Sequence, residues 1–151
     1  MRRTFVIGII ITGHGGFASG LEENLKMLVG NVDGVVAIPF EKEMSFELYD
    51  EKISSAMDRF AGVPTLVFTD ITGGTPFNRA AMLSLKRENV RVLGGANAAM
   101  LVDTAMRSMM DEEIADMTEL AEDILASGRE NMSCYKLSTN CVEVADMEAG
   151  I

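Results

Sequence analysis

The stretch Phe-Val-Ile-Gly-Ile-Ile-Ile-Thr-Gly-His-Gly-Gly, residues 5–16, decides how this sequence should fold. Its first part, residues 5–12, is an almost unbroken apolar run rich in isoleucine. Such a run is typical of a central parallel strand, because helices cover both faces of that strand. The glycines on either side of His14 then end the run. We therefore predict a buried first strand that ends in a glycine loop carrying His14.

Strands and helices are expected to alternate along the rest of the chain. Apolar runs predict strands at 35–40, 63–69 and 90–93. Apolar residues at helical spacing predict helices at 17–28, 46–60, 76–85, 98–109 and 112–125. Gly30 is the expected stop of the first helix, Ser45 the expected cap of the second, and Pro76 the expected first residue of the third. Two weaker strands are expected in the tail, at 133–137 and 141–144.

Successive strand–helix units predict the α/β class, as a doubly wound, mostly parallel sheet with helices on both faces. Right-handed crossovers and a strand order of 2-1-3-4 would make the first and third strands neighbours. Their connections would then leave to opposite faces, and ligands bind beyond the carboxyl ends of the strands at such a switch point. We expect residues 1–151 to form a single domain with a C-terminal tail from about residue 131.

Composition narrows the classes of function. The chain has 151 residues, of which 48% are hydrophobic and 24% charged, enough for one globular core. No apolar stretch approaches the roughly 18 residues that a membrane-spanning helix needs. The net charge of −10 argues against nonspecific binding of nucleic acid or of an anionic membrane, and it is compatible with a basic protein partner.

The metal-binding residue types are few. Cys134 and Cys141 match neither a zinc ribbon nor a disulfide framework, so we expect two buried or half-buried thiols in a reducing cytosol. His14 is the single histidine of the chain, which disfavours a histidine-rich metal site. We therefore expect a function that needs no metal and no bound cofactor.

A second polar cluster, Thr-Asp-Ile-Thr-Gly-Gly-Thr-Pro, occupies residues 69–76. Asp70 ends the predicted third strand, and Gly73 and Gly74 precede the predicted helix. Free backbone N–H groups at that helix start, with the hydroxyls of Thr72 and Thr75, are expected to form an anion cradle. The cluster is not a Walker motif, because it lacks Gly-Lys-Ser/Thr. Taken alone, it could equally be a tight turn with Asp70 as a helix cap.

The two clusters together indicate a chemistry. Adjacent strands lie about 4.8 Å apart, so His14 and Asp70 can meet beyond neighbouring strand ends. A carboxylate that accepts one ring N–H fixes the imidazole tautomer and leaves the other nitrogen as a nucleophile. An anion cradle beside that nitrogen would hold a phosphoryl group. The pattern therefore predicts a histidine that accepts a phosphoryl group.

The same residues resemble the IIA component of the mannose family of the bacterial sugar phosphotransferase system. The matching segments are Ile-Thr-Gly-His-Gly at 11–15, Thr-Asp at 69–70 with Gly-Gly-Thr-Pro-Phe-Asn at 73–78, and Gly-Ala-Asn at 95–97 with Met-Leu at 100–101. The resemblance covers roughly residues 4–130. Residues 12–21 look most like the N-acetylgalactosamine/galactosamine branch. Thr72 stands where some members have an aromatic residue, and Thr75 where some have serine.

The resemblance implies a cytoplasmic, homodimeric phosphotransferase component. It would accept a phosphoryl group from phospho-HPr on Nε2 of His14 and pass it to a separate IIB component, for sugar uptake through IIC and IID. Asp70 would accept a hydrogen bond from the other ring nitrogen, and Gly73, Gly74 and Thr75 would line the phosphoryl pocket. The resemblance also implies a C-terminal strand exchanged between subunits.

Other functions fit the pattern less well. A receiver-like switch phosphorylated on Asp70 would need an acidic pair after the first strand. A nucleotide-binding module would need the third glycine of a Rossmann fingerprint, and a hydrolase using Thr75 or Ser19 with His14 would need a nucleophile elbow. Within the resemblance, the runner-up is a phosphoryl donor subunit of a dihydroxyacetone kinase.

Overall fold

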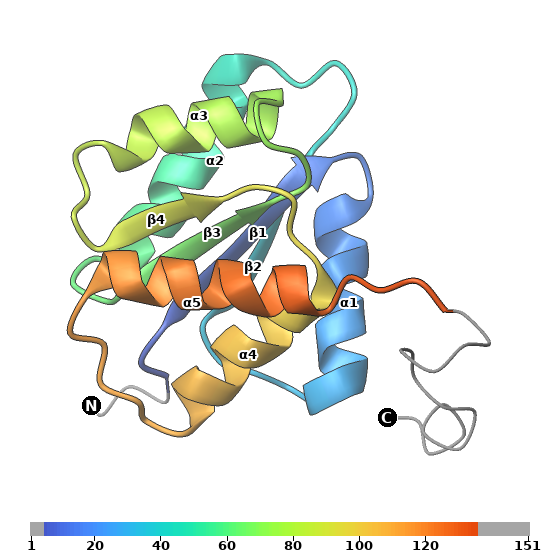
Figure 1. Cartoon of the computed structure of the whole chain (residues 1–151). Helices are drawn as coiled ribbons and strands as arrows, with labels where there is room; N and C mark the ends of the chain where they lie inside the picture. The colour runs from blue at the N-terminus through green and yellow to red at the C-terminus, as the bar shows by residue number, and fades with distance from the viewer. Residues whose placement is uncertain (1–4, 136–151) are drawn as a thin grey trace.

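The structure, a computed structural model, describes residues 5–135 (Figure 1). In chain order the elements are β1 (Gly8–His14), α1 (Phe17–Val29), β2 (Val35–Phe40), α2 (Phe46–Arg59), β3 (Thr65–Thr69), α3 (Thr75–Ser84), β4 (Val90–Leu93), α4 (Ala98–Met109) and α5 (Met117–Glu130). The strands form one parallel sheet in the order β2-β1-β3-β4. The predicted α/β class and strand order are therefore confirmed.

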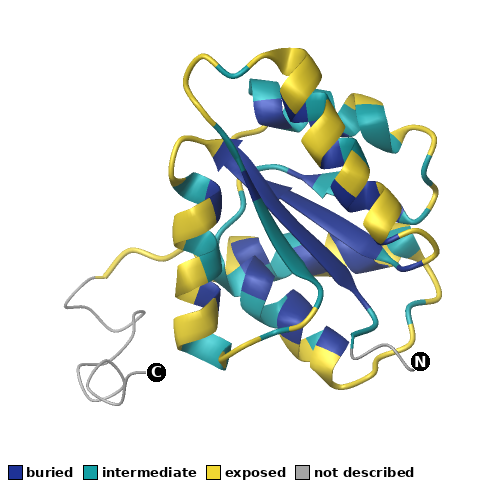
Figure 2. Ribbon diagram, turned by 180° about the vertical axis from the view of Figure 1, so that it is seen from behind, coloured by how far each residue is buried: buried dark blue, intermediate teal, exposed yellow. Residues whose placement is uncertain are grey.

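Helices cover both faces of the sheet (Figures 1 and 2). On one face, Ile9 and Ile11 of β1 pack in a core cluster with α1, α4 and α5. On the other face, Ile10 packs in a second cluster with α2 and α3. All three side chains are fully buried, because successive residues of a strand point to opposite faces. The isoleucine run thus has the burial on both faces that its composition predicted.

The predicted helix ends are largely confirmed. The Ser45 hydroxyl caps α2 by accepting the N–H of Leu48 at 3.2 Å. Gly30 follows α1 with a φ of 81°, a conformation that glycine adopts without strain. Pro76 lies in the first turn of α3, which begins one residue earlier, at Thr75. A proline there removes an N–H that has no helical acceptor.

Two strands begin later than predicted. β1 begins at Gly8 instead of Phe5, and the half-buried side chain of Phe5 packs against the core cluster beneath α2 and α3. β3 begins at Thr65 instead of Val63. Pro64 precedes it and has no N–H to donate to a sheet ladder, which accounts for the later start.

The last helix also begins later than predicted. The expected helix at 112–125 is α5, which starts at Met117 and continues to Glu130. Asp116 sets this start, because its Oδ1 accepts the N–H groups of Thr118 at 2.7 Å and Glu119 at 3.2 Å. An aspartate that caps a helix satisfies amides that have no helical acceptor, so the acidic residues before it stay outside the helix.

The tail predictions fall mostly beyond the described residues. Of the expected strand at 133–137, residues 133–135 are described and do not form a strand, whereas 136–137 lie outside the described part. The expected strand at 141–144 lies wholly outside it, as does Cys141. Cys134 is exposed, so the expectation that it is buried or half-buried is wrong. Within residues 5–135, no helix combines the length and apolarity needed to cross a membrane.

Candidate functional site

The candidate site lies where β1 and β3 end side by side. His14 is the last residue of β1, and Asp70 directly follows β3. The two strands pair in parallel up to Thr12 and Thr69, which brings both polar residues to the same edge of the sheet. The helices that follow, α1 and α3, cover opposite faces, so this edge is the predicted switch point.

The carboxylate of Asp70 holds His14 at two atoms. Its Oδ2 lies 2.7 Å from Nδ1 of the imidazole and accepts the backbone N–H of His14 at 2.8 Å. Its Oδ1 accepts the backbone N–H of Ile71 at 2.9 Å. Both carboxylate oxygens are therefore engaged, and the ring of His14 is attached to the loop after β3.

These contacts fix the charge of Asp70 and the tautomer of His14. Partial burial raises the pKa of the Asp70 carboxyl, but the hydrogen bonds from the His14 amide, the His14 ring and the Ile71 amide outweigh burial and lower this pKa below its ordinary value. Asp70 is thus ionised at neutral pH and can only accept hydrogen bonds. In the neutral ring the proton must then lie on Nδ1, which leaves a free lone pair on Nε2.

The unprotonated nitrogen of His14 is open to a reactant. The side chain is 49% exposed, although the Asp70 side chain beside it is only 16% exposed. Among the described residues, Nε2 has no hydrogen-bond partner. The arrangement therefore offers an oriented imidazole whose neutral form has its nucleophilic nitrogen at the surface.

The loop before α3 lies against the same ring. Gly73 has a φ of 84°, and Gly74 is the residue before the helix. A Cβ on Gly74 would lie 3.1 Å from Cε1 of His14, so this glycine allows the backbone to approach the imidazole. The N–H groups of Gly73 and Thr75 have no acceptor in the part of the chain that is described. They are free donors at a helix N-terminus, which favours an anion.

Asn78 supports this loop, a role that the sequence did not reveal. Its side-chain amide donates to the carbonyl of Gly73 at 2.9 Å, and its backbone N–H donates to the carbonyl of Gly74 at 2.9 Å. The only sequence signal for this role is the position of Asn78, which ends the motif that begins with the glycine pair. The double contact holds the loop against the first turn of α3.

The two threonines of the predicted cradle, Thr72 and Thr75, differ in burial and in their neighbours. Thr75 is the half-buried first residue of α3. Thr72 is exposed, and its Oγ1 occupies the space that a Cβ on Gly94 would need. The Thr72 hydroxyl therefore packs towards the end of β4, on the side of β3 away from β1.

Aromatic rings of β2 and α2 lie behind His14. The ring of Phe40 meets the imidazole at a centroid distance of 5.8 Å, and Tyr49 meets Phe40 at 5.0 Å. The hydroxyl of Tyr49 lies 2.6 Å from Oγ1 of Thr12, and burial raises the pKa of Tyr49 to about 12. The sequence places Phe40 at the end of a strand and Tyr49 within a helix, and only the strand register brings Phe40 opposite His14.

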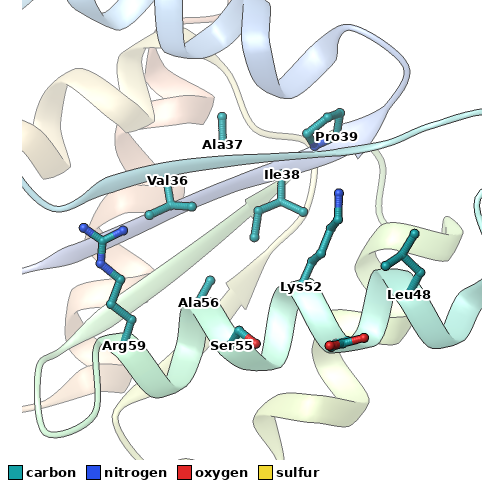
Figure 3. Close-up of a pocket in the computed structure, with 10 residues that line it drawn as sticks. Val36, Ala37, Ile38, Pro39, Leu48, Lys52, Ser55, Ala56 and Arg59 are labelled. Carbon is teal, nitrogen blue, oxygen red and sulfur yellow. The ribbon is translucent and has the colours of Figure 1, made fainter.

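A separate hollow of about 500 Å³ lies between β2 and α2 (Figure 3). Figure 3 shows Val36 and Ile38 of the strand opposite Ala56 of the helix, with Lys52 and Arg59 at the sides. Neither His14 nor Asp70 lines it, and its lining residues include no nucleophilic histidine or cysteine. Within residues 5–135, no group of three or more His, Cys, Asp or Glu could hold a metal ion.

Comparison with known proteins supports the family that the sequence resembles. Residues 8–124 match the family model EIIA-man, described as the PTS system fructose IIA component. The sorbose-specific EIIA component of Lacticaseibacillus casei is 28% identical over 83% of this chain and 93% of its own length. The fructose-specific EIIA component of Bacillus subtilis is 31% identical over 65% of this chain and 68% of its own length.

A solved structure supports the fold as well as the family. The mannose/sorbose-specific IIA subunit from Enterococcus faecalis superimposes with a TM-score of 0.77 at 25% identity, over 89% of this chain and 98% of that one. The family match spans residues 8–124, which contain His14, Asp70 and the glycine loop. The chain belongs to the mannose family of EIIA components of the sugar phosphotransferase system.

Proposed function

We propose that this chain is a phosphohistidine carrier. It accepts a phosphoryl group from phospho-HPr on Nε2 of His14 and donates it to a IIB component. The observation that carries the proposal is the 2.7 Å contact between His14 Nδ1 and Asp70 Oδ2, which leaves Nε2 as the free nucleophile. A surface histidine without such a carboxylate would divide its proton between both nitrogens.

The transfer follows from this geometry. The lone pair of Nε2 attacks phosphorus as the bond between phosphorus and HPr breaks, and the electron pair of that bond leaves with HPr. The imidazole becomes cationic, because Nδ1 keeps its proton while Nε2 gains a substituent. The ionised carboxylate of Asp70 stabilises that charge without moving. Return of the bonding pair to Nε2 on transfer to IIB regenerates the neutral ring.

The loop before α3 would hold the phosphoryl oxygens. The N–H groups of Gly73 and Thr75, together with the close approach of Gly74 to the ring, support this role. The positive end of the helix macrodipole would add to the attraction of the anion. Thr72 contributes by shaping the loop against Gly94, since its hydroxyl packs in that direction.

The partners and setting are inferred from the family. HPr and IIB act in the cytoplasm. IIB then phosphorylates the sugar as it enters through IIC and IID. The relatives named above serve sorbose and fructose, so the N-acetylgalactosamine/galactosamine branch stays a prediction from residues 12–21. These relatives are components for sugars, which disfavours the dihydroxyacetone role.

Homodimer formation by strand exchange is part of the same proposal. Within the described residues β4 is the last strand of the sheet and pairs only with β3. A hollow beside it is lined by Val90, Val92, Phe77 and Met117, among others. A tail strand from a second copy would pair with the free side of β4 and cover these apolar residues.

The test is a chase experiment. The chain would be phosphorylated with radiolabelled phosphoenolpyruvate, enzyme I and HPr, purified, and mixed with an isolated IIB component of the mannose family. We expect the label to move to IIB, and to move back to His14 when labelled phospho-IIB is mixed with an excess of the unphosphorylated chain. Label that stays on this chain with an active IIB would contradict the carrier role.

A further inference from the structure

We infer that Phe40 is a positioning residue for phosphoryl transfer, holding the imidazole of His14 so that Nε2 stays aimed outwards. The inference deepens the proposed function and rests on it. The two rings meet at a centroid distance of 5.8 Å with an interplanar angle of 82°. Such T-shaped contacts have a preferred geometry, so the orientation of one ring restrains that of the other.

The need for a second support follows from the contact with Asp70. A hydrogen bond from Nδ1 to Oδ2 fixes one atom of the ring, but the imidazole can still pivot about that contact. Pivoting would swing Nε2 away from its line of attack. Displacements of about 1 Å can cost on the order of 10²-fold in rate, because transfer requires an aligned nucleophile. A contact away from Nδ1 is therefore required to fix the direction of Nε2.

Strand register places Phe40 where it can supply that contact. His14 and Phe40 are paired positions of the parallel strands β1 and β2, so their side chains leave the sheet on the same face. The backbone N–H of Gly15 donates to the carbonyl of Phe40 at 3.0 Å, which extends the ladder past His14. The backbones of the two ring-bearing residues are thus held in register.

The ring of Phe40 is itself backed by the core. Tyr49 of α2 meets it at 5.0 Å and an angle of 71° and is fully buried. The hydroxyl of Tyr49 is anchored 2.6 Å from Oγ1 of Thr12, which is also fully buried. Close-packed interiors transmit such constraints, because a buried ring has few alternative positions. Phe40 therefore links the rigid core to the exposed imidazole.

Gly74 limits the ring from the loop before α3. A Cβ at that position would lie 3.1 Å from Cε1 of His14, so the loop backbone comes close to the imidazole. His14 is accordingly restrained at three places, by Asp70 at Nδ1, by Gly74 near Cε1 and by the ring of Phe40. Removal of the Phe40 ring would release one of these restraints while leaving the hydrogen bond and the charge of Asp70 in place.

The test compares Phe40→Leu with two other variants. Phe40→Tyr keeps an aromatic ring and serves as the conservative rescue. Phe46→Leu is the matched control. The ring centroid of Phe46, on the first turn of α2, lies 6.3 Å from that of Phe40. Among the described residues, Phe46 makes no ring contact with His14. Phosphorylation of His14 is measured with phospho-HPr and with phosphoramidate, a small donor that needs no protein docking surface.

A ring readout accompanies the rates. His14 is the only histidine of the chain, so the imidazole signals in a long-range ¹H–¹⁵N spectrum belong to one residue. We expect Phe40→Leu to slow phosphorylation by about tenfold with both donors and to shift and broaden the carbon-bound imidazole protons. Phe40→Tyr should stay within about twofold of the original rate, and Phe46→Leu should leave the phosphoramidate rate unchanged.

Two results would overturn the inference. One is an unchanged phosphoramidate rate in Phe40→Leu; a loss seen with phospho-HPr alone would then make Phe40 a docking residue. The other is an equal slowing in Phe46→Leu. Failure of the original chain to become phosphorylated would instead contradict the proposed function. The imidazole spectra of the unmodified variants would still report whether Phe40 orients the ring.

Discussion

One oxygen of Asp70 binds His14 twice, accepting the backbone N–H at 2.8 Å and lying 2.7 Å from Nδ1 of the ring. The backbone contact fixes the carboxylate relative to the end of β1, and the side-chain contact fixes the ring relative to the carboxylate. The same residue thus sets the position of the imidazole, its tautomer and the stability of its charged form. Each property can be tested separately.

Asp70→Asn should slow phosphorylation of His14 on the order of 10²-fold while the fold is retained. The amide carries no charge to stabilise the imidazolium, and an N–H of the new side chain facing Nδ1 would move the ring proton to Nε2. The measurement is the initial rate with phospho-HPr. Asp58→Asn is the matched control, because it removes the same charge from an aspartate that pairs with Arg87. Equal rates in both variants would contradict the role of Asp70.

The lowered pKa of Asp70 predicts a pH-dependent contribution to stability. A carboxyl whose pKa is depressed in the folded state stabilises that state above its unfolded pKa, about 3.9, and loses the contribution as pH falls through the folded pKa. The difference in free energy of unfolding between the original chain and Asp70→Asn should be constant near neutrality and shrink below about pH 4. Urea unfolding across this range measures it. A difference that grows on acidification would contradict the assignment.

Gly74→Ala should impair transfer more than stability. The new Cβ would lie 2.9 Å from Cγ2 of Ile71 and 3.1 Å from Cε1 of His14, so the ring or the loop must shift. We expect a rate loss of about tenfold and a stability loss below about 1 kcal/mol, because Ile71 is exposed and can move.

The control for this substitution is Gly20→Ala. A Cβ on Gly20, within α1, would meet nothing within 4 Å. Alanine there should raise the free energy of unfolding by about 1 kcal/mol through helix propensity and leave transfer unchanged. A Gly74→Ala chain that transfers at the original rate would show that the loop does not restrain the ring.

Tyr49→Phe should destabilise the chain by about 1–2 kcal/mol. It leaves the fully buried hydroxyl of Thr12 without the partner that now lies 2.6 Å away. Because burial raises the pKa of Tyr49 to about 12, the hydroxyl is neutral and the loss should not vary near neutral pH. Adding Thr12→Val should recover part of the lost free energy of unfolding, because no unpaired hydroxyl then remains. Chemical unfolding of the single and double variants measures this recovery. A Tyr49→Phe chain of unchanged stability would contradict this account.

The sheet was predictable because its signal is local. The isoleucines of β1 point alternately into two core clusters, which is why an unbroken apolar run marks a strand covered on both faces. The meeting of His14 and Asp70 followed from strand order, because parallel strands bring their carboxyl ends to one edge. Neither inference required the position of a side chain.

Features that depend on competing local interactions or on register were not predictable. The apolar spacing predicts a helix from residue 112, but the hydrogen bonds accepted by Asp116 start the helix at Met117. The contact of Phe40 with His14 depends on the pairing of β2 with β1. The direction of the Thr72 hydroxyl depends on Gly94, a neighbour distant in sequence.

The most direct test of the central claim is the intact mass of the chain after incubation with phosphoenolpyruvate, enzyme I and HPr, compared with His14→Ala. His14 is half exposed at a strand end, so its removal should leave the chain folded. We predict a gain of one phosphoryl group that is acid-labile and base-stable, and no gain in His14→Ala. An unmodified mass with active HPr, or an equal gain in His14→Ala, would contradict the assignment of His14 as the phosphoryl acceptor.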